Sequence, residues 1–153
     1  MSIQKGDACP KFSLKNQFDQ TVDIADFLGK KNMVIFFYPK DETPGCTKEA
    51  CAFRDSYEVF QDLDCEVIGI SSDPVDKHDK FAKRHNLPFQ LLADTKRQVR
   101  SAFGVPNNLF GLIPGRVTYI IDKNGIIKGI FNSQTDPVGH IKNALETLNG
   151  LNN

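Results

Sequence analysis

The stretch of residues 33–57 constrains the fold of this 153-residue chain more than any other part of it. It opens with an unbroken run of apolar, β-branched and aromatic residues from Met33 to Tyr38, which is typical of a strand buried on both faces. Pro39 ends this strand, because proline lacks the backbone N–H that a further ladder bond needs. After Thr43-Pro44-Gly45, residues 46–57 have the composition and apolar spacing of a helix. The segment therefore predicts a buried strand, a short loop and a helix.

Cys46 stands at or near the start of the predicted helix. Unpaired backbone N–H groups and the helix dipole favour negative charge there, so the position stabilises a thiolate relative to a thiol. The thiolate is the nucleophilic form of cysteine. A small buried hydrophobe is the ordinary alternative for a free cysteine, but it explains poorly why one follows Thr-Pro-Gly at a helix start. We therefore predict that Cys46 is a reactive thiol.

A second cysteine, Cys51, follows five positions later on the same predicted helix. In a helix, residues five apart point to different faces, and their Cα atoms lie roughly 8 to 9 Å apart. A disulfide tolerates Cα separations of up to about 7 Å. If the two sulfurs ever bond, the first turns of this helix must therefore unwind.

The rest of the chain predicts an α/β fold in one domain over residues 1–153, since its helix and strand patterns alternate and a helix between two buried strands implies a parallel crossover. The C-terminal helix carries one apolar stripe, formed by Val138, Ile141, Leu145 and Leu148. Residues 105–115 are the least regular segment, and we expect its apolar side chains, which include Leu109, Phe110 and Leu112, to cover part of the core. The expected elements are a hairpin over 11–24, a helical turn near 26–29, a strand at 32–38, a helix over 45–62, a strand at 65–71, a helix over 76–86, a short strand within 87–94, a helix over 95–103, a hairpin over 116–131 and a helix over 136–148.

Composition narrows the classes of function. Nineteen basic and nineteen acidic side chains give zero formal net charge, which argues against a nucleic-acid partner. No apolar stretch approaches the roughly 20 residues of a membrane span, and the N-terminus lacks a signal-peptide core, so we expect no membrane association. Four cysteines without a signal peptide suggest a reducing compartment. We expect a cytoplasmic location, or an organelle if a targeting segment has been trimmed.

The run Pro39-Lys40-Asp41-Glu42-Thr43-Pro44-Gly45-Cys46 matches the Pro-x-x-x-Thr-x-x-Cys signature of the peroxiredoxins, which are thiol peroxidases. With Thr47, Glu49, Ala50 and Phe53-Arg54-Asp55 around it and Cys51 at plus five, the chain resembles the Q subfamily, also called the bacterioferritin comigratory protein type. The resemblance covers nearly the whole chain and is most specific over residues 39–55. It implies a thioredoxin-like fold, with a central mixed sheet flanked by helices and an extra N-terminal hairpin.

The resemblance also implies roles for four residues near the cysteine. Thr43 would direct its hydroxyl at the peroxide, although a helix-capping or turn threonine is the alternative. Pro39 would shield the thiolate as well as ending the strand. Arg116 would stabilise the thiolate and the leaving oxygen, although a solvated arginine is the alternative. Glu49 would orient Arg116, although a helix-surface glutamate is the alternative. Many relatives carry serine after the arginine where this chain has Val117.

Cys51 is the resolving thiol that the resemblance implies, and a buried helix cysteine is the alternative. Cys46 would react with hydrogen peroxide or an organic hydroperoxide to give a sulfenic acid, and Cys51 would condense with it to an intramolecular disulfide. Thioredoxin or a similar dithiol would restore both thiols in a monomeric enzyme that needs no metal, haem, flavin or other cofactor. We expect Cys65 to be a core residue and Cys9 a bystander thiol.

Two further expectations complete the hypothesis. His78, His85 and His140 stand apart on predicted helices with no cysteine or carboxylate at ligand spacing, so we expect no metal site. A different class of function keeps the same chemistry: a redox sensor or signalling module in which the Cys46–Cys51 bond switches the helix between wound and unwound states. Peroxide turnover with a thiol donor distinguishes the enzyme from the sensor.

Overall fold

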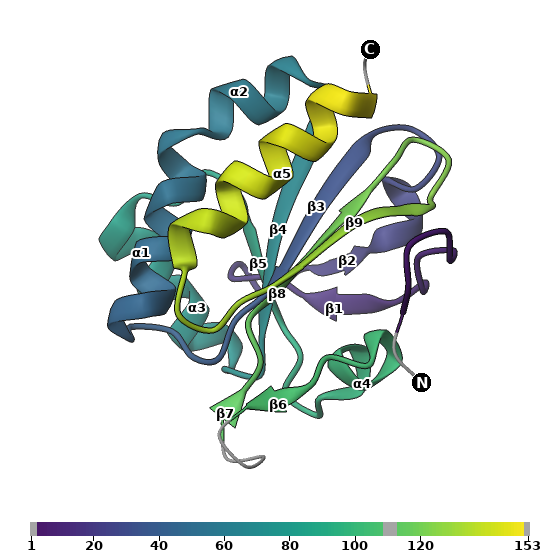
Figure 1. The fold of residues 1–153 in the computed structure, drawn as a ribbon. Helices are drawn as coiled ribbons and strands as arrows, with labels where there is room; N and C mark the ends of the chain where they lie inside the picture. The colour runs from purple at the N-terminus through teal and green to yellow at the C-terminus, as the bar shows by residue number, and fades with distance from the viewer. Residues whose placement is uncertain (1–2, 109–112, 152–153) are drawn as a thin grey trace.

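A computed structural model describes residues 3–108 and 113–151 of the chain. Seven strands form one mixed sheet in the order β2-β1-β5-β4-β3-β8-β9, and helices cover both of its faces (Figure 1). The elements in chain order are β1 (Ser13–Lys15), β2 (Thr21–Asp23), the 3-10 helix η1 (Ile24–Asp26), β3 (Asn32–Phe37), α1 (Pro44–Asp55), α2 (Tyr57–Asp62), β4 (Cys65–Ser71), α3 (Val75–His85), β5 (Gln90–Ala93), α4 (Gln98–Phe103), β6 (Asn107–Asn108), β7 (Ile113–Pro114), β8 (Val117–Ile121), β9 (Ile127–Asn132) and α5 (Pro137–Leu151).

The central strand β3 explains why its sequence is apolar without alternation. It lies parallel to β4 and antiparallel to β8, and all six of its residues are buried. Successive side chains point to opposite faces of a strand. Val34 and Phe36 therefore enter the core on one face of the sheet, while Ile35 and Phe37 enter the core on the other. The strand that leads to the predicted reactive cysteine is thus fixed on both sides.

The two faces of the sheet have different coverings. Side chains of α1, α2, α3 and α5 build the core on one face, where the rings of Phe36 and Phe53 stack with centroids 4.5 Å apart. Residues of η1 and α4 build the core on the other face. Figure 1 shows α5 running beside α1 and α2 on the first face. The helix that carries Cys46 and Cys51 therefore packs against this face of the sheet and alongside the C-terminal helix.

Two sequence-based expectations need correction. The helix expected over 45–62 is two helices, because Ser56 adopts φ −104° and ψ 7°, outside the helical range, and serine competes poorly for helix interiors. Val138 is 51% exposed rather than part of the buried stripe of α5. At about 100° per residue it lies roughly a quarter turn from the centre of the face that buries Ile141, Ala144 and Leu148.

Other boundaries shift by a few residues. The turn expected near 26–29 begins earlier, as η1, and the helix expected over 95–103 begins at Gln98. The predicted apolar residues Leu109, Phe110 and Leu112 lie outside the described residues. Within residues 3–108 and 113–151, none of the helices is both long enough and apolar enough to cross a bilayer.

Candidate active site

Cys46 is the third residue of α1, and its side chain is 1% exposed. Thr43 occupies the N-cap position and Pro44 the first helical position, where the missing N–H of proline costs no hydrogen bond. Burial raises the pKa of the Cys46 thiol above its ordinary value. The positive charge of Arg116, the Thr43 hydroxyl and the backbone of Lys40 act in the opposite direction. The predicted preference for the thiolate is therefore opposed by burial and depends on these neighbours.

The Thr43 hydroxyl does not cap α1. Its backbone is extended at the N-cap, but its side chain makes no capping hydrogen bond and its Oγ1 donates to the Lys40 carbonyl, 2.9 Å away. The capping alternative is therefore wrong, whereas the bond to Lys40 fits the turn alternative. The hydroxyl also helps to lower the pKa of the Cys46 thiol. Pro39 is half-buried, two residues beyond the end of β3.

The structure brings Arg116 next to Cys46, although the two are far apart in the sequence. The Arg116 side chain is buried, and its Nη1 donates to Oε1 of Glu49 over 2.8 Å. Its Nε donates to the Gln134 carbonyl over 3.3 Å. A Cβ on Gly45 would lie 2.9 Å from Arg116 Nη2, so glycine before the cysteine leaves the room that the guanidinium occupies. The solvated alternative for Arg116 is wrong.

Glu49 is fully buried, so the surface alternative for this residue is also wrong. Burial raises the pKa of its carboxyl to about 8, against the lowering effect of Arg116. Its second oxygen, Oε2, has no hydrogen-bond partner and lies 3.4 Å from Nδ1 of His140. The arrangement can hold Arg116 in place, and it leaves one oxygen of the Glu49 carboxyl group buried beside His140.

The histidines do not stand apart as the sequence predicted. His140 is buried on α5, with Nδ1 2.7 Å from the Thr118 hydroxyl and Nε2 donating to the Ser133 carbonyl over 2.8 Å. Burial lowers its pKa to about 4, so its ring is neutral near pH 7. His78 is buried against Asp41. Helix positions facing the core were the available signal, but pairing with distant carboxylates depends on tertiary contacts that spacing does not reveal.

The four cysteines fall into two groups. Cys51 is half-buried on α1, which is wound over its whole length, and it is a free thiol, as are the other three. Cys9 is buried and burial raises its pKa to about 12. Burial also raises the pKa of the Cys65 thiol, helped by the charges of Glu66 and Asp64. Cys9 and Cys65 are therefore poor nucleophiles, in keeping with their predicted roles.

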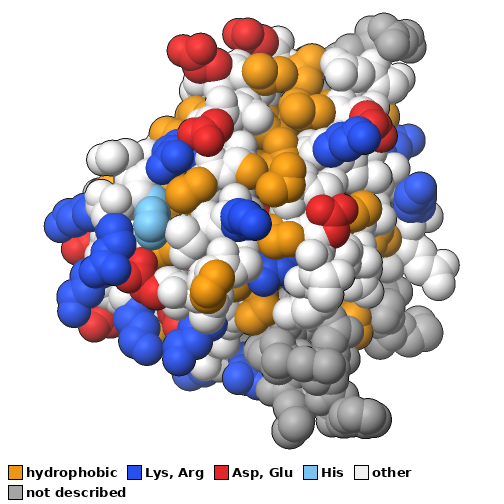
Figure 2. All heavy atoms as spheres, turned by 60° about the vertical axis from the view of Figure 1, so that its left-hand side comes forward, with side chains coloured by type: hydrophobic (Ala, Val, Ile, Leu, Met, Phe, Trp, Pro, Cys, Tyr) orange, Lys and Arg blue, Asp and Glu red, His pale blue; other side chains and the backbone are white. Residues whose placement is uncertain are grey.

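The face of the molecule drawn in Figure 2 carries both charged and apolar side chains. Figure 2 shows basic and acidic side chains gathered on its left and a broken band of apolar side chains near its middle. Val59 of α2 and Val138 of α5 are among the exposed large apolar side chains. The face combines apolar area with charges of both signs rather than a single-sign field.

Comparison with known proteins decides the family. The profile described as the AhpC/TSA family matches residues 5–130. The chain belongs to this family, as a Q-type peroxiredoxin. Its sequence is 50% identical over 149 residues to a protein named peroxiredoxin Q, chloroplastic, from Sedum lineare, covering 97% of this chain and 80% of that protein.

Solved structures agree with this assignment. The fold superposes on a crystal structure of peroxidoxin BcpB from Mycobacterium tuberculosis with a TM-score of 0.90 at 35% identity, covering 97% of this chain and 98% of that one. A bacterioferritin comigratory protein from Xanthomonas campestris, described for its alkyl peroxide reduction activity, gives a TM-score of 0.84 at 26% identity over 93% of this chain and 92% of that one. The mixed sheet flanked by helices is therefore the expected thioredoxin-like peroxiredoxin fold. Members of this family are thiol-dependent peroxidases, so this Q-type peroxiredoxin is an oxidoreductase.

Proposed function

We propose that this peroxiredoxin reduces hydrogen peroxide and organic hydroperoxides through Cys46, resolves the product with Cys51, and is recycled by thioredoxin or a similar dithiol protein. The observation that carries the proposal is the surroundings of Cys46: a thiol in the first turn of α1, with the Arg116 guanidinium and the Thr43 hydroxyl lowering its pKa against the effect of burial.

In the first step the Cys46 thiolate attacks one peroxide oxygen. A sulfur–oxygen bond forms, the O–O bond breaks, and the remaining oxygen leaves as an alkoxide or hydroxide that takes up a proton to become an alcohol or water. Cys46 is oxidised to a sulfenic acid. Arg116 keeps its charge throughout and stabilises the leaving oxyanion, because a buried guanidinium acts at low effective dielectric. The Thr43 hydroxyl hydrogen-bonds to the peroxide, Pro39 excludes water, and Glu49 orients Arg116.

In the second step the Cys51 thiol attacks the Cys46 sulfenic sulfur, a disulfide forms, and water leaves. Both residues lie on the wound helix α1, five positions apart, so the helix must open first. A dithiol donor then reduces the disulfide by thiol–disulfide exchange and is itself oxidised.

The relatives bear on the proposed substrate and on the cellular location. The Xanthomonas campestris protein is described for alkyl peroxide reduction, which supports organic hydroperoxides as substrates here. The plant relatives are named as chloroplastic, which supports the organelle rather than the cytoplasm among the two locations expected for this chain. The proposal includes neither a metal nor an organic cofactor.

The test is peroxide consumption coupled to thioredoxin, thioredoxin reductase and NADPH. We expect Cys46→Ser to abolish turnover. Cys51→Ser should permit one round of peroxide reaction and then stop, because no disulfide forms for thioredoxin to reduce. Cys65→Ser is the matched control, since this buried thiol lies outside α1, and it should turn over normally.

Two outcomes would overturn the proposal. Normal turnover of Cys51→Ser with thioredoxin would assign the resolving role to Cys9 or Cys65. The second outcome is a wild-type chain that forms the Cys46–Cys51 bond but, with every thiol donor tried, consumes no more than one equivalent of peroxide. That result would favour the sensor function.

A further inference from the structure

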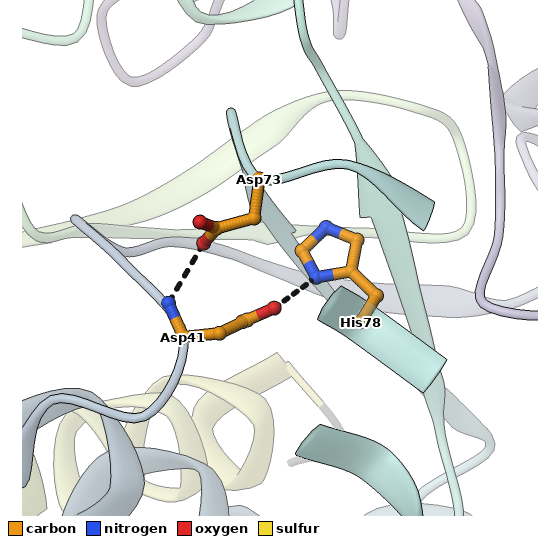
Figure 3. Close-up of side chains that lie close together, drawn as sticks. All are labelled: Asp41, Asp73 and His78. Carbon is orange, nitrogen blue, oxygen red and sulfur yellow. Dashed lines mark hydrogen bonds and ion pairs between the residues drawn. The ribbon is translucent and has the colours of Figure 1, made fainter. Parts of the chain in front are cut away.

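A second buried polar cluster lies beside the loop that leads into α1. Asp41 of this loop, Asp73 after β4 and His78 of α3 place potential ligand atoms within 4.8 Å of one another. Figure 3 shows Asp41 between the other two, with its side chain directed at the ring of His78 and its backbone N–H at the carboxylate of Asp73. All three side chains are buried, and His78 is 0% exposed.

The contacts of His78 account for both of its ring nitrogens. Nδ1 lies 2.6 Å from Oδ2 of Asp41, and Nε2 lies 3.1 Å from the Leu92 carbonyl. A carbonyl only accepts, so Nε2 carries a proton, and the short contact with Asp41 needs another proton between its two atoms. The other Asp41 oxygen accepts from the Tyr38 hydroxyl over 2.6 Å. These atoms are hydrogen-bonded to one another, which argues for a structural network rather than a cation site.

The backbone of Asp41 is held from the opposite direction. Its N–H donates to Oδ2 of Asp73 over 2.7 Å, and the Ser71 hydroxyl donates to the same oxygen over 2.8 Å. Buried polar groups that are fully paired fix one geometry, because any displacement leaves a group unpaired at low dielectric. Asp41 is therefore held through side chain and backbone by residues at the ends of β3 and β4 and on α3.

The residues on either side of Asp41 reach the active site. The preceding residue, Lys40, accepts from Thr43 over 2.9 Å, and its backbone hydrogen-bonds to the Cys46 thiol. The following residue, Glu42, has φ +67°, a left-handed conformation that costs roughly 1 to 2 kcal/mol outside glycine. Its side chain pairs with Arg84 of α3 over 2.7 Å. A shift of Asp41 would therefore move the groups that contact the Cys46 sulfur.

We propose that His78 is a positioning residue of the peroxidase: through Asp41 it holds the loop of residues 39–43 in the geometry in which Cys46 reacts with peroxide. The inference rests on the proposed role of Cys46. The bonds that hold Asp41 come from Tyr38 after β3, Asp73 after β4 and His78 of α3 rather than from α1. In this proposal they stay in place while α1 unwinds and supply a fixed point from which α1 winds back.

Two substitutions of His78, to asparagine and to glutamine, distinguish a positioning role from an effect on folding stability alone. An asparagine amide can replace the donor at Nδ1 and keep the bond to Asp41, whereas a glutamine amide reaches as far as Nε2 and keeps the bond to Leu92. In a Cys51→Ser background, stopped-flow mixing with hydrogen peroxide and trapping of the sulfenic acid measure the first step alone. We expect His78→Gln to slow this step roughly ten- to hundredfold, as misplacement of reacting groups by about 1 Å does, and His78→Asn to restore most of the rate.

The control is Phe103→Leu, a core substitution on α4 across the sheet from α1. It should lower thermal stability without slowing sulfenic acid formation. With Cys51 present, disulfide formation after oxidation should be unchanged in His78→Gln. If His78→Gln does not fold, Tyr38→Phe removes a single hydroxyl from Asp41 and should slow the same step.

The outcomes are distinct from those of the proposed function. Equal rates for His78→Gln and wild type, or an equal loss in His78→Asn and His78→Gln, would overturn the positioning role while Cys46→Ser stays inactive. If Tyr38→Phe is the variant used and it forms the sulfenic acid at the wild-type rate, the positioning role of His78 would likewise be overturned. Activity in Cys46→Ser would instead overturn the proposed function.

Discussion

Cys46 illustrates how a residue can be placed for reaction and still resist ionisation. Its burial raises the pKa of the thiol, and Arg116 and Thr43 act against that rise. Arg116 interacts with both acidic groups of the site: its Nη1 donates to Glu49, and its positive charge lowers the pKa of Cys46. Among the groups that favour the thiolate over the thiol, the charge of Arg116 therefore has the largest effect.

The first prediction concerns the pH dependence of the peroxide step. Because the pKa of Cys46 is raised, the thiolate fraction and the single-turnover rate should increase with pH through the neutral range and level off only above that pKa. Arg116→Met removes the charge at similar volume, so the inflection should move to higher pH and the rate at pH 7 should fall about a hundredfold or more. Stopped-flow rates between pH 5 and pH 10 check both. An unchanged inflection in Arg116→Met would contradict the assigned role of Arg116.

At the scale of elements, the proposed mechanism gives α1 two tasks that conflict. Its first turn presents Cys46 beside Arg116, and its winding keeps Cys51 out of reach. Opening the helix also withdraws Glu49, which lies between the two cysteines in the sequence, from its buried partners. In the proposed mechanism, the stability of this one helix therefore sets the balance between reaction with peroxide and disulfide formation.

A helix-weakening substitution tests that balance. Lys48 is exposed and lies between the two cysteines, and glycine in a helix interior costs about 1 kcal/mol. Lys48→Gly should speed disulfide formation about three- to fivefold and reduce overoxidation to sulfinic acid at high peroxide. Lys142→Gly is the matched control, since Lys142 is an exposed lysine on α5. Similar acceleration in both variants would show that the effect does not arise in α1.

Glu49 of α1 makes the free energy of unfolding depend on pH. Its pKa is raised to about 8 in the folded chain, from an ordinary value of 4.5, so the folded state holds a proton that the unfolded state has released. The stability that this proton contributes is complete below about pH 4.5 and is lost as pH rises through about 8. Urea unfolding from pH 5 to pH 8 should show wild type losing stability relative to Glu49→Gln, by at most about 1.4 kcal/mol per pH unit. Parallel curves for the two proteins would contradict a raised pKa at Glu49.

At the scale of the whole molecule, the sheet has two edge strands, and few large apolar side chains are exposed for contact with a second copy. β2 is an edge strand of three residues, and β9 carries the exposed Lys128 on the other edge. Short strands and charged side chains at edges disfavour pairing between copies. Among the described residues, the exposed large apolar side chains are Phe18 in the turn between β1 and β2, Val59 of α2 and Val138 of α5.

We therefore predict a monomer in solution. Sedimentation equilibrium of the reduced chain at micromolar concentration should return the mass of one copy, 17.1 kDa. Oxidation should leave that mass unchanged, since the proposed disulfide is intramolecular. A concentration-dependent rise toward twice the mass would contradict the prediction, and reversal of such a rise by reductant would point to a disulfide between chains.

The sequence predicted those parts of the molecule that local pattern determines. The unbroken apolar run of β3 and the helix start near Cys46 both follow from short-range chemistry. The contact of Arg116 with Glu49 and Cys46 does not, because it depends on β8 pairing beside β3. The contact of His78 with Asp41 was missed for the same reason, since it depends on how the loop after β3 meets α3 in the folded chain.

The most direct test of the proposed chemistry is to map which cysteines are linked after oxidation. Reduced protein should be treated with one equivalent of hydrogen peroxide, blocked with an alkylating reagent, digested without reductant and analysed by mass spectrometry. We predict one linked pair, Cys46 with Cys51, while Cys9 and Cys65 are recovered as alkylated or protected thiols. A preparation that turns over peroxide with thioredoxin yet yields Cys46 linked to another cysteine, or to none, would contradict this prediction.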